Sequence, residues 1–277
     1  MSVYNDEEYL GEAIESILNQ SFSNYEFLII DDASTDRSLD IIKDYAEKDD
    51  RIHYFQLEKN QGLTRNLNFL LDQSQGDYIA RMDGNDISLP SRFEKQLKTL
   101  RKSNADMVWS NIVFIDQSGN EICNRFQPSL KKNLKDLRLK KNHIVHANSI
   151  YKKEVVMKLG KYNDEYKTGQ DGDLWYRMLL NNCSFVLINQ PLFKLRLEQF
   201  SITAMRIGKN EDINFLYANC CMKNFQKKKS ITYIRKVKSI KLKTMLLVRF
   251  FLSERLIQLI KNKFPNDYDS NHKSLQN

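Results

Sequence analysis

Apolar and polar residues in the first half of the chain follow patterns that predict alternating strands and helices. Residues 25–30 are almost wholly apolar, which is typical of a parallel-sheet strand covered on both faces. Residues 10–18 carry apolar side chains at helical spacing and favour a helix with one buried face. The same patterns predict strands at 52–57 and 78–82 and helices at 37–47, 63–72 and 90–101. This alternation indicates a doubly wound α/β sheet with right-handed crossovers.

Two of the predicted strands end in acidic loops. One runs into Asp31-Asp32-Ala33-Ser34-Thr35-Asp36 and the other into Asp83-Gly84-Asn85-Asp86. Ligands bind beyond the carboxyl ends of strands in open α/β sheets, so both loops can open on one edge of the sheet. Their carboxylate and amide oxygens suit a hard cation. Asp, Gly and Asn are also ordinary turn residues, and either loop alone leaves both interpretations open.

Helix starts carry candidate caps. We expect Asn5 or Asp6 to cap the helix near residue 10, and Ser88, with Pro90, to open the helix at 90–101. Asp171 precedes a helix predicted at 174–181, where a carboxylate is favoured by the exposed amides and the helix dipole. Asp171 is therefore either a helix cap or a functional carboxylate. Further strands are predicted at 107–115, 146–151, 185–188 and 192–197.

Charge separates the end of the chain from its beginning. The 277 residues carry a net charge of +8, and Lys and Arg crowd segment 223–263 while the first hundred residues are near balance. This distribution predicts a basic appendage on an anionic surface. We expect a main domain at 1–205, a helical basic region at 206–264 and a polar tail at 265–277.

Cysteine usage and hydropathy bear on where the protein works. Cys123, Cys183, Cys220 and Cys221 show no metal-ligand spacing, which fits a reducing compartment. The sequence holds no apolar run near the roughly 20 residues that span a bilayer. We therefore expect a cytosolic protein.

Four motifs, in order along residues 1–205, resemble family 2 glycosyltransferases, which are inverting nucleotide-sugar enzymes of the GT-A fold. The opening is Ser2-Val3-Tyr4-Asn5, with Tyr9-Leu10 and Ser16-Ile17-Leu18-Asn19-Gln20-Ser21. The loop that begins at Ile30 and ends at Asp36 is similar to the family's nucleotide loop, and Ala80 to Asp86 to its metal loop. Gln170-Asp171, with Leu174-Trp175 and Arg177, is similar to its catalytic motif.

The resemblance implies roles for individual residues. Asp171 would be the general base, and Asp83, Asn85 and Asp86 would hold Mn²⁺ or Mg²⁺. Nucleotide-sugar contacts would come from Val3, Tyr4, Asn5, Asp32, Ser34, Asp83 and Gly84. His146, Gln170 and Arg196 would lie on the acceptor or diphosphate side, although a lone histidine at a strand edge is often structural. Physically, a cation held by carboxylates neutralises the departing diphosphate, and a positioned carboxylate takes the acceptor's proton.

Two positions depart from the family pattern. Asn85 stands where the metal loop has an acid, and Gln170 stands where a Glu precedes the catalytic Asp. The resemblance still implies transfer of a hexosyl or N-acetylhexosaminyl group, from a UDP-sugar, to a glycan or lipid-linked acceptor in surface polysaccharide synthesis, such as lipopolysaccharide or capsule. The alternative is a catalytically weakened nucleotide-sugar-binding or scaffold protein.

The basic region has two interpretations as well. Segment 227–263 alternates cationic clusters with apolar runs, which predicts amphipathic helices on the cytosolic face of an anionic membrane. The same pattern fits helices that pack on the sheet with solvated lysines. It carries no recognised nucleic-acid-binding motif, and we expect no nucleic-acid partner.

The first strand is short for the central strand of such a sheet. Family members carry several apolar residues before the segment that matches Ser2 to Asn5, and a missing stretch would leave unpaired backbone groups and an open apolar slot. We therefore expect the natural protein to begin roughly five to ten residues upstream, by the usual length of a strand. The alternative is a genuinely short protein in which Met1 to Asn5 pairs as a stub.

Overall fold

The computed structural model describes residues 1–125, 144–198, 217, 227–237, 243 and 246–247. The chain forms two compact units, one of residues 1–115 and 124–196 and the other of residues 116–123 and 197–277. Every residue to which the sequence assigns a role in the site lies in the first unit. Within the described residues, no helix is both long enough and apolar enough to span a bilayer.

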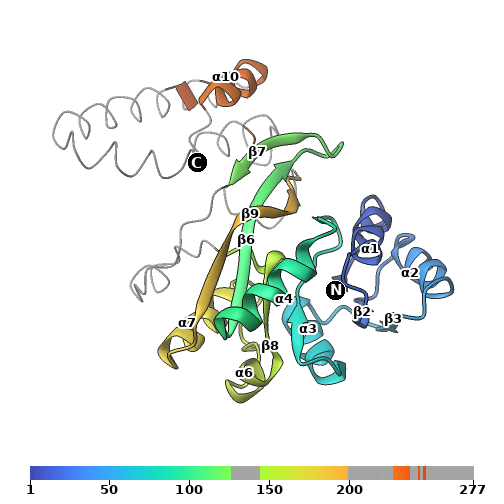
Figure 1. Ribbon diagram of the computed structural model, residues 1–277. Helices are drawn as coiled ribbons and strands as arrows, with labels where there is room; N and C mark the ends of the chain where they lie inside the picture. Colours follow the sequence, from blue (N-terminus) through green and yellow to red (C-terminus); the bar gives the residue numbers. More distant parts are fainter. Residues whose placement is uncertain (126–143, 199–216, 218–226, 238–242, 244–245, 248–277) are drawn as a thin grey trace, which may run out of the picture. The chain divides into compact units, whose positions relative to one another are not determined.

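The first unit opens with a small parallel sheet. Its strand order is β1 (Ser2–Val3), β2 (Phe27–Asp31) and β3 (Ile52–Gln56). Figure 1 labels β2 and β3 of this sheet. In register, Ser2 pairs with Ile30 and Phe27 pairs with Ile52. The helices that connect and follow these strands are α1 (Leu10–Leu18), α2 (Ser38–Ala46) and α3 (Leu63–Gln73). Helices α1 and α3 each bury an apolar stripe, as the helical spacing predicts, whereas α2 fully buries only Ile42 of its apolar side chains.

A second, mixed sheet has the order β4 (Tyr78–Ala80), β8 (Ile150–Lys152), β6 (Met107–Ile115), β9 (Phe185–Arg196) and β5 (Ile87–Ser88). Only the β6–β9 pairing on this path is parallel. All nine residues of β6 are buried, as expected for a central strand covered on both faces. Helices α4 (Arg92–Ser103), α6 (Lys153–Lys158) and α7 (Gln170–Leu180) complete the unit, with a 3₁₀ turn, η1 (His146–Asn148), before β8.

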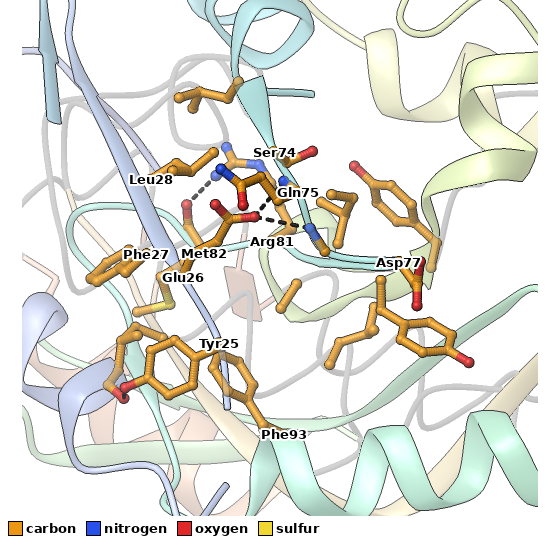
Figure 2. A pocket seen from close by; sticks show the side chains of 18 of the residues that line it. Tyr25, Glu26, Phe27, Leu28, Ser74, Gln75, Asp77, Arg81, Met82 and Phe93 are labelled. Atoms are coloured by element: carbon orange, nitrogen blue, oxygen red, sulfur yellow. Dashed lines mark hydrogen bonds between the residues drawn. The ribbon is translucent and has the colours of Figure 1, made fainter. Parts of the chain in front are cut away.

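An open slot lies between residues of β2 and β4. Its walls include Leu28 of β2, Ile79 of β4, Leu71 of α3 and Leu97 of α4, and it encloses about 610 Å³. At its rim, a Glu26 carboxylate oxygen accepts the backbone N–H groups of Gln75 and Gly76 at 2.5 and 2.9 Å (Figure 2). The strand pairings place β4 in the second sheet, beside β8, so the expected single sheet is divided into two at this slot.

Several predicted boundaries differ from the structure. The segments 185–188 and 192–197 form one strand, β9, whose register shifts opposite Ser110 to Ile112 of β6. His146 lies in η1, and the strand begins only at Ile150.

The expected caps near residue 6 and at Ser88 are wrong. Helix α1 begins after Tyr9 without a side-chain cap, and Ser88 belongs to β5, so that α4 begins after Ser91. Tertiary contacts override the local cap signals at both places, because Ser88 is buried in strand pairing with Phe193.

The described part of the second unit is small. Asp116 and Asn120 close a tight turn, in which the Asp116 N–H donates to the Asn120 carbonyl at 2.9 Å, and β7 (Glu121–Arg125) begins in this segment. Helix α10 spans Lys227–Lys236, and its Ile234 is buried. Cys220, Cys221, the polar tail 265–277 and most of the basic segment 227–263 lie outside the described residues. Cys123 and Cys183 are free thiols.

Candidate active site

The end of β1 is joined to the loop after β2 through Asn5. This residue adopts a left-handed backbone, with φ of 55°, a conformation that Asn tolerates better than most residues. Its side-chain oxygen accepts the Thr35 N–H at 2.8 Å, and its own N–H donates to the Ser34 hydroxyl at 3.0 Å. Tyr4, just before it, is 48% exposed, whereas Val3 is fully buried. The opening motif and the loop 31–36 therefore form one surface.

Asp32 supports that surface through hydrogen bonds of its buried carboxylate. Its side chain is buried, and its two carboxylate oxygens accept the N–H groups of Gln61 and Gly62 at 2.7 and 2.9 Å. These bonds hold the loop before α3 against the end of β2. The neighbouring Asp31 is also buried, with one oxygen on the Ser34 N–H at 3.2 Å and the other without a hydrogen-bond partner among the described residues. The resemblance assigned a nucleotide-sugar contact to Asp32 only, and that assignment stays a prediction.

The acidic loop 83–86 holds carboxylates of two kinds. The Asp83 side chain is 42% exposed and forms an ion pair with Arg81, whose side chain is almost fully buried. Asp86 is buried, and its carboxylate accepts the backbone N–H of Arg196 at 2.9 Å. Asp83 is therefore the carboxylate of this loop that faces solvent, while Asp86 fastens the loop to the end of β9.

Arg196 is the second fastening of the same loop. Its Nε donates to the Asn85 carbonyl at 2.9 Å, its guanidinium pairs with Glu12 of α1, and the group stacks 4.2 Å from the centre of the Tyr9 ring. The Arg196 side chain is only 1% exposed. Glu12 belongs to none of the sequence motifs. It comes to lie beside the loop only in the folded chain.

Gly84 lies where the acidic loop meets the Asp6 side chain. A Cβ built on Gly84 would stand 2.6 Å from Asp6 Oδ2, closer than real Cβ atoms approach another atom. Asp6 thus brings a third carboxylate to this loop from the opening segment. Asp83, Asn85 and Asp6 offer the hard oxygen donors that Mg²⁺ and Mn²⁺ prefer, so the donor set fits such an ion in chemical type. The described residues include no ready-made group of three acidic, His or Cys ligands around one point.

Asp171 lies in the first turn of α7. The residue before the helix is Gly169, in a left-handed conformation with φ of 85°, and no side chain caps the helix. The helix-cap interpretation of Asp171 is therefore wrong. Gln170 is buried and Asp171 is half-buried. Farther along, Arg177 pairs with Asp173 at 2.8 Å and donates to the Leu159 and Lys161 carbonyls, which anchors α7.

A buried polar cluster lies against α7. His146 Nε2 and the Tyr162 hydroxyl are 2.7 Å apart, and the Tyr162 and Tyr151 hydroxyls are 2.9 Å apart. The rings of His146 and Tyr151 meet Trp175 of α7 edge-on, at 5.8 and 6.0 Å between centroids. Neither Tyr151 nor Tyr162 carried a signal in the sequence, since an isolated tyrosine reads as core.

Burial, and then the nearby positive charge of Arg81, hold the pKa of His146 well below its usual value, so the ring is neutral at neutral pH. Burial raises the pKa of Tyr151 to about 12. Burial raises the pKa of Tyr162 well above its usual value, and the neighbouring Tyr151 raises it further, while the charge of Arg81 lowers it and that of Asp171 raises it least. Arg81, whose positive charge lowers the pKa of all three groups, also forms the ion pair with Asp83 of the acidic loop.

The class of this fold is shown by solved structures. The chain aligns with S. aureus TarS, residues 1–349 in complex with UDP-GlcNAc, at a TM-score of 0.61 and 18% identity, covering 90% of this chain and 70% of that one. It aligns with the mannosyltransferase PcManGT from Pyrobaculum calidifontis, in complex with GDP-Man and Mn²⁺, at a TM-score of 0.58 and 13% identity, over 96% of this chain and 86% of that one. The expected GT-A-like α/β fold with a mixed sheet is confirmed.

Sequence comparison then defines the family. Residues 1–160 match the model described as glycosyl transferase family 2. An uncharacterized glycosyltransferase of Methanocaldococcus jannaschii is 35% identical over 234 residues, which cover 83% of this chain and 79% of the relative. The O-antigen biosynthesis glycosyltransferase WbnJ of Escherichia coli is 32% identical over 238 residues, 84% of this chain and 89% of the relative. The chain belongs to glycosyl transferase family 2 and is a glycosyltransferase.

Proposed function

We propose that this glycosyltransferase moves a sugar, with inversion, from a UDP-sugar to a glycan or lipid-linked acceptor in surface polysaccharide synthesis. The observation that carries the proposal is the placement of Asp171. Its half-buried carboxylate stands in the first turn of α7, the helix whose Trp175 packs against the rings of His146 and Tyr151. A base and an acidic loop thus occur in one unit, as an inverting displacement requires.

The donor would lie along the surface formed by the opening motif and loop 31–36. Tyr4 offers an exposed ring to a nucleobase, and Asn5 with Ser34 fixes the loop around it. Asp32 supports the loop through the backbone of Gln61 and Gly62. A UDP-sugar is favoured because TarS is described in complex with UDP-GlcNAc. Whether the sugar is a hexose or an N-acetylhexosamine is a finer proposal of the same kind.

A divalent cation is proposed at the acidic loop. Asp83 and the Asn85 side chain would hold it, with Asp6 nearby through its contact with Gly84, while Asp86 supports the loop from within. When bound, Mn²⁺ or Mg²⁺ would neutralise charge on the departing diphosphate. The mannosyltransferase complex with Mn²⁺ supports this choice.

The acceptor hydroxyl would lose its proton to Asp171. A carboxylate in this position can take that proton as the new glycosidic bond forms and the bond to the diphosphate breaks, which inverts the anomeric carbon. His146 is neutral and half-buried, so it would act by hydrogen bonding on the acceptor side, without carrying a positive charge. Gln170 is buried beside the base and would support the turn that presents it.

The pathway is proposed from relatives. One relative is named for O-antigen biosynthesis, and a teichuronic acid biosynthesis glycosyltransferase of Bacillus subtilis is 27% identical over 81% of this chain. Both products are surface polysaccharides. The basic C-terminal region would hold the enzyme at an anionic membrane, on the cytoplasmic side, where lipid-linked acceptors lie.

A panel of UDP- and GDP-sugars, assayed for binding with and without Mn²⁺ and then for transfer, tests the proposal. We expect one UDP-sugar to bind more tightly with Mn²⁺ and to be consumed when acceptor is present. Binding without any transfer or hydrolysis, across the panel and with polysaccharide-lipid acceptors, would favour the catalytically weakened binding protein, for which Asn85 and Gln170 are the motivation. Equal binding with and without the metal would remove the cation from the proposal.

A further inference from the structure

Tyr162 belongs to no motif of the sequence, yet its hydroxyl occupies the centre of the buried cluster. It lies 2.7 Å from His146 Nε2 and 2.9 Å from the Tyr151 hydroxyl. Tyr162 is 2% exposed, its contact with Tyr151 is buried, and its contact with the half-buried His146 is partly buried. A buried hydroxyl with two polar partners can donate one hydrogen bond and accept another. Among the described residues, Tyr162 is the recorded hydrogen-bond partner of both the Tyr151 hydroxyl and His146 Nε2, two polar atoms that are costly to leave unpaired.

The backbone of Tyr162 is held independently of its side chain. Asn68 of α3 clamps it on both sides, because the Asn68 oxygen accepts the Tyr162 N–H at 3.0 Å and the Asn68 amide donates to the Tyr162 carbonyl at 2.9 Å. The position of the Tyr162 backbone, and so of the side chain that carries the hydroxyl, is therefore fixed relative to α3. Removing the hydroxyl alone should leave this clamp, and the ring packing, in place.

The cluster touches both parts of the proposed site. Tyr151 belongs to β8, which pairs with β4 ahead of the acidic loop, with Ile79 opposite Tyr151. On the other side, the rings of His146 and Tyr151 pack edge-on against Trp175, in the second turn of the helix that begins with Gln170 and Asp171. The partners of Tyr162 therefore link the strand before the acidic loop with the helix that carries Asp171.

We propose that Tyr162 is a positioning residue for sugar transfer, whose hydroxyl fixes the His146 ring and, through Trp175, the first turn of α7. This inference rests on the proposed function, since it assigns Tyr162 an effect through His146 and Asp171. Tyr162 stays protonated and hydrogen-bonded throughout the reaction and exchanges no proton with the substrate.

Two matched variants test the inference. Tyr162→Phe removes the central hydroxyl, and Tyr151→Phe removes the outer one while the Tyr162–His146 contact remains. Each deletes one buried hydroxyl, so we expect both to lower the midpoint of thermal unfolding by similar amounts. We expect kcat to fall by about 5- to 50-fold in Tyr162→Phe only, because small displacements of a reacting group are costly. The Kd of the UDP-sugar should change less than about twofold in both variants.

The outcomes separate this inference from the proposed function. Wild-type kcat in Tyr162→Phe, or an equal loss of kcat in the two variants, overturns the positioning role, because a merely structural hydroxyl would act through stability alone. A parallel loss of donor affinity also overturns it. Asp171→Asn, assayed beside them, reports on the proposed base alone. If that variant is inactive while Tyr162→Phe is fully active, only the inference about Tyr162 fails.

Discussion

Asp171 shows how a single residue acquires a role that its sequence context leaves open. Along the chain it could equally be a helix cap, but the helix starts after Gly169 and no side chain caps it. The structure shows that Asp171 is not the cap but lies inside the first turn, where a carboxylate is still favoured by the helix dipole. Helix starts are set by a backbone conformation that sequence patterns locate only to within one or two residues.

Asp171→Asn should reduce the transfer rate by about 100-fold or more, because the amide cannot accept a proton from the acceptor. The Kd of the UDP-sugar, measured by calorimetry, should stay near wild type. Asp173→Asn is the matched control, since it alters the same turn but removes only a partly exposed ion pair with Arg177, of about 0–1 kcal/mol. A rate above a tenth of wild type in Asp171→Asn would exclude it as the base.

Gly84→Ala should disturb the acidic loop, because the added methyl would stand 2.6 Å from Asp6 Oδ2. We expect Mn²⁺ affinity, followed by electron paramagnetic resonance, to fall at least about fivefold, as overpacking of this kind typically costs about 1–3 kcal/mol. Gly76→Ala is the control, since its methyl would meet its nearest neighbour at an ordinary 3.5 Å. Equal Mn²⁺ affinity in the two variants would place the cation away from this loop.

His146 makes stability depend on pH below neutrality. Burial and Arg81 lower its pKa in the folded protein, so below about pH 6.5 the unfolded chain binds a proton that the folded chain does not. The free energy of unfolding should therefore fall as the pH drops from 7 to 5, by up to about 1.4 kcal/mol per unit. Urea titrations of His146→Gln should show a shallower fall than wild type. His53→Gln, at an exposed histidine of β3, controls for the loss of an imidazole elsewhere in the fold.

At the scale of elements, the sequence predicted the alternation and most strands but not the caps. Strongly apolar segments such as β2 and β6 are recognised as strands in the sequence, because burial on both faces favours apolar residues at most positions. The start of α4 could not be predicted in this way. Its Phe93 N–H donates to the side-chain oxygen of Gln20, at 3.1 Å, from the residues just after α1. A cap supplied from that far along the chain leaves no local signal.

The same limit applies to the acidic loop. The motif 83–86 was recognisable, but its fastening to Arg196 and Glu12 depends on elements that meet only in the fold. The sequence assigned Arg196 to the acceptor or diphosphate side, and that assignment stays a prediction. The structure adds contacts that hold the loop, since both the backbone N–H and the side chain of Arg196 are bonded to residues 85 and 86.

Arg196→Gln should loosen the connection between β9 and the acidic loop. The change deletes a buried guanidinium with partners on Asn85, Glu12 and the Tyr9 ring, so we expect about 1–3 kcal/mol of stability to be lost. Donor and Mn²⁺ affinity should fall with it. Glu12→Gln keeps the Asn85 contact and should cost no more than about 1 kcal/mol, because Glu12 is half-exposed. Denaturant midpoints give the comparison, and equal losses would show that the ion pair alone matters.

At the scale of the whole molecule, the predicted membrane attachment of the basic C-terminal region rests mainly on the sequence. In the described part of α10 and just beyond it, Ile234 and Val237 are buried whereas Arg235 and Lys236 are exposed. Apolar side chains there are taken up by packing, so attraction to a membrane would come from the exposed cations. Most of the segment lies outside the described residues.

Liposome flotation tests this attraction. We expect the full chain to float with vesicles that contain phosphatidylserine, to be released as salt is raised, and to stay behind with neutral vesicles. A chain without residues 227–277 that keeps its thermal unfolding midpoint should no longer float. Equal recovery with neutral and anionic vesicles would exclude an electrostatic membrane role.

The contacts of Arg196 with the acidic loop can form only late in the synthesis of the chain. Asp86 and Arg196 are 110 positions apart, and Glu12 and Arg196 are 184 apart. Chains are made at about 5–20 residues per second, so several seconds pass between the synthesis of the acidic loop and the synthesis of Arg196. Contacts of such high sequence separation also form slowly. A nascent chain that has reached residue 160 already carries the whole family-matched segment, yet it still lacks the arginine that fixes residues 85 and 86.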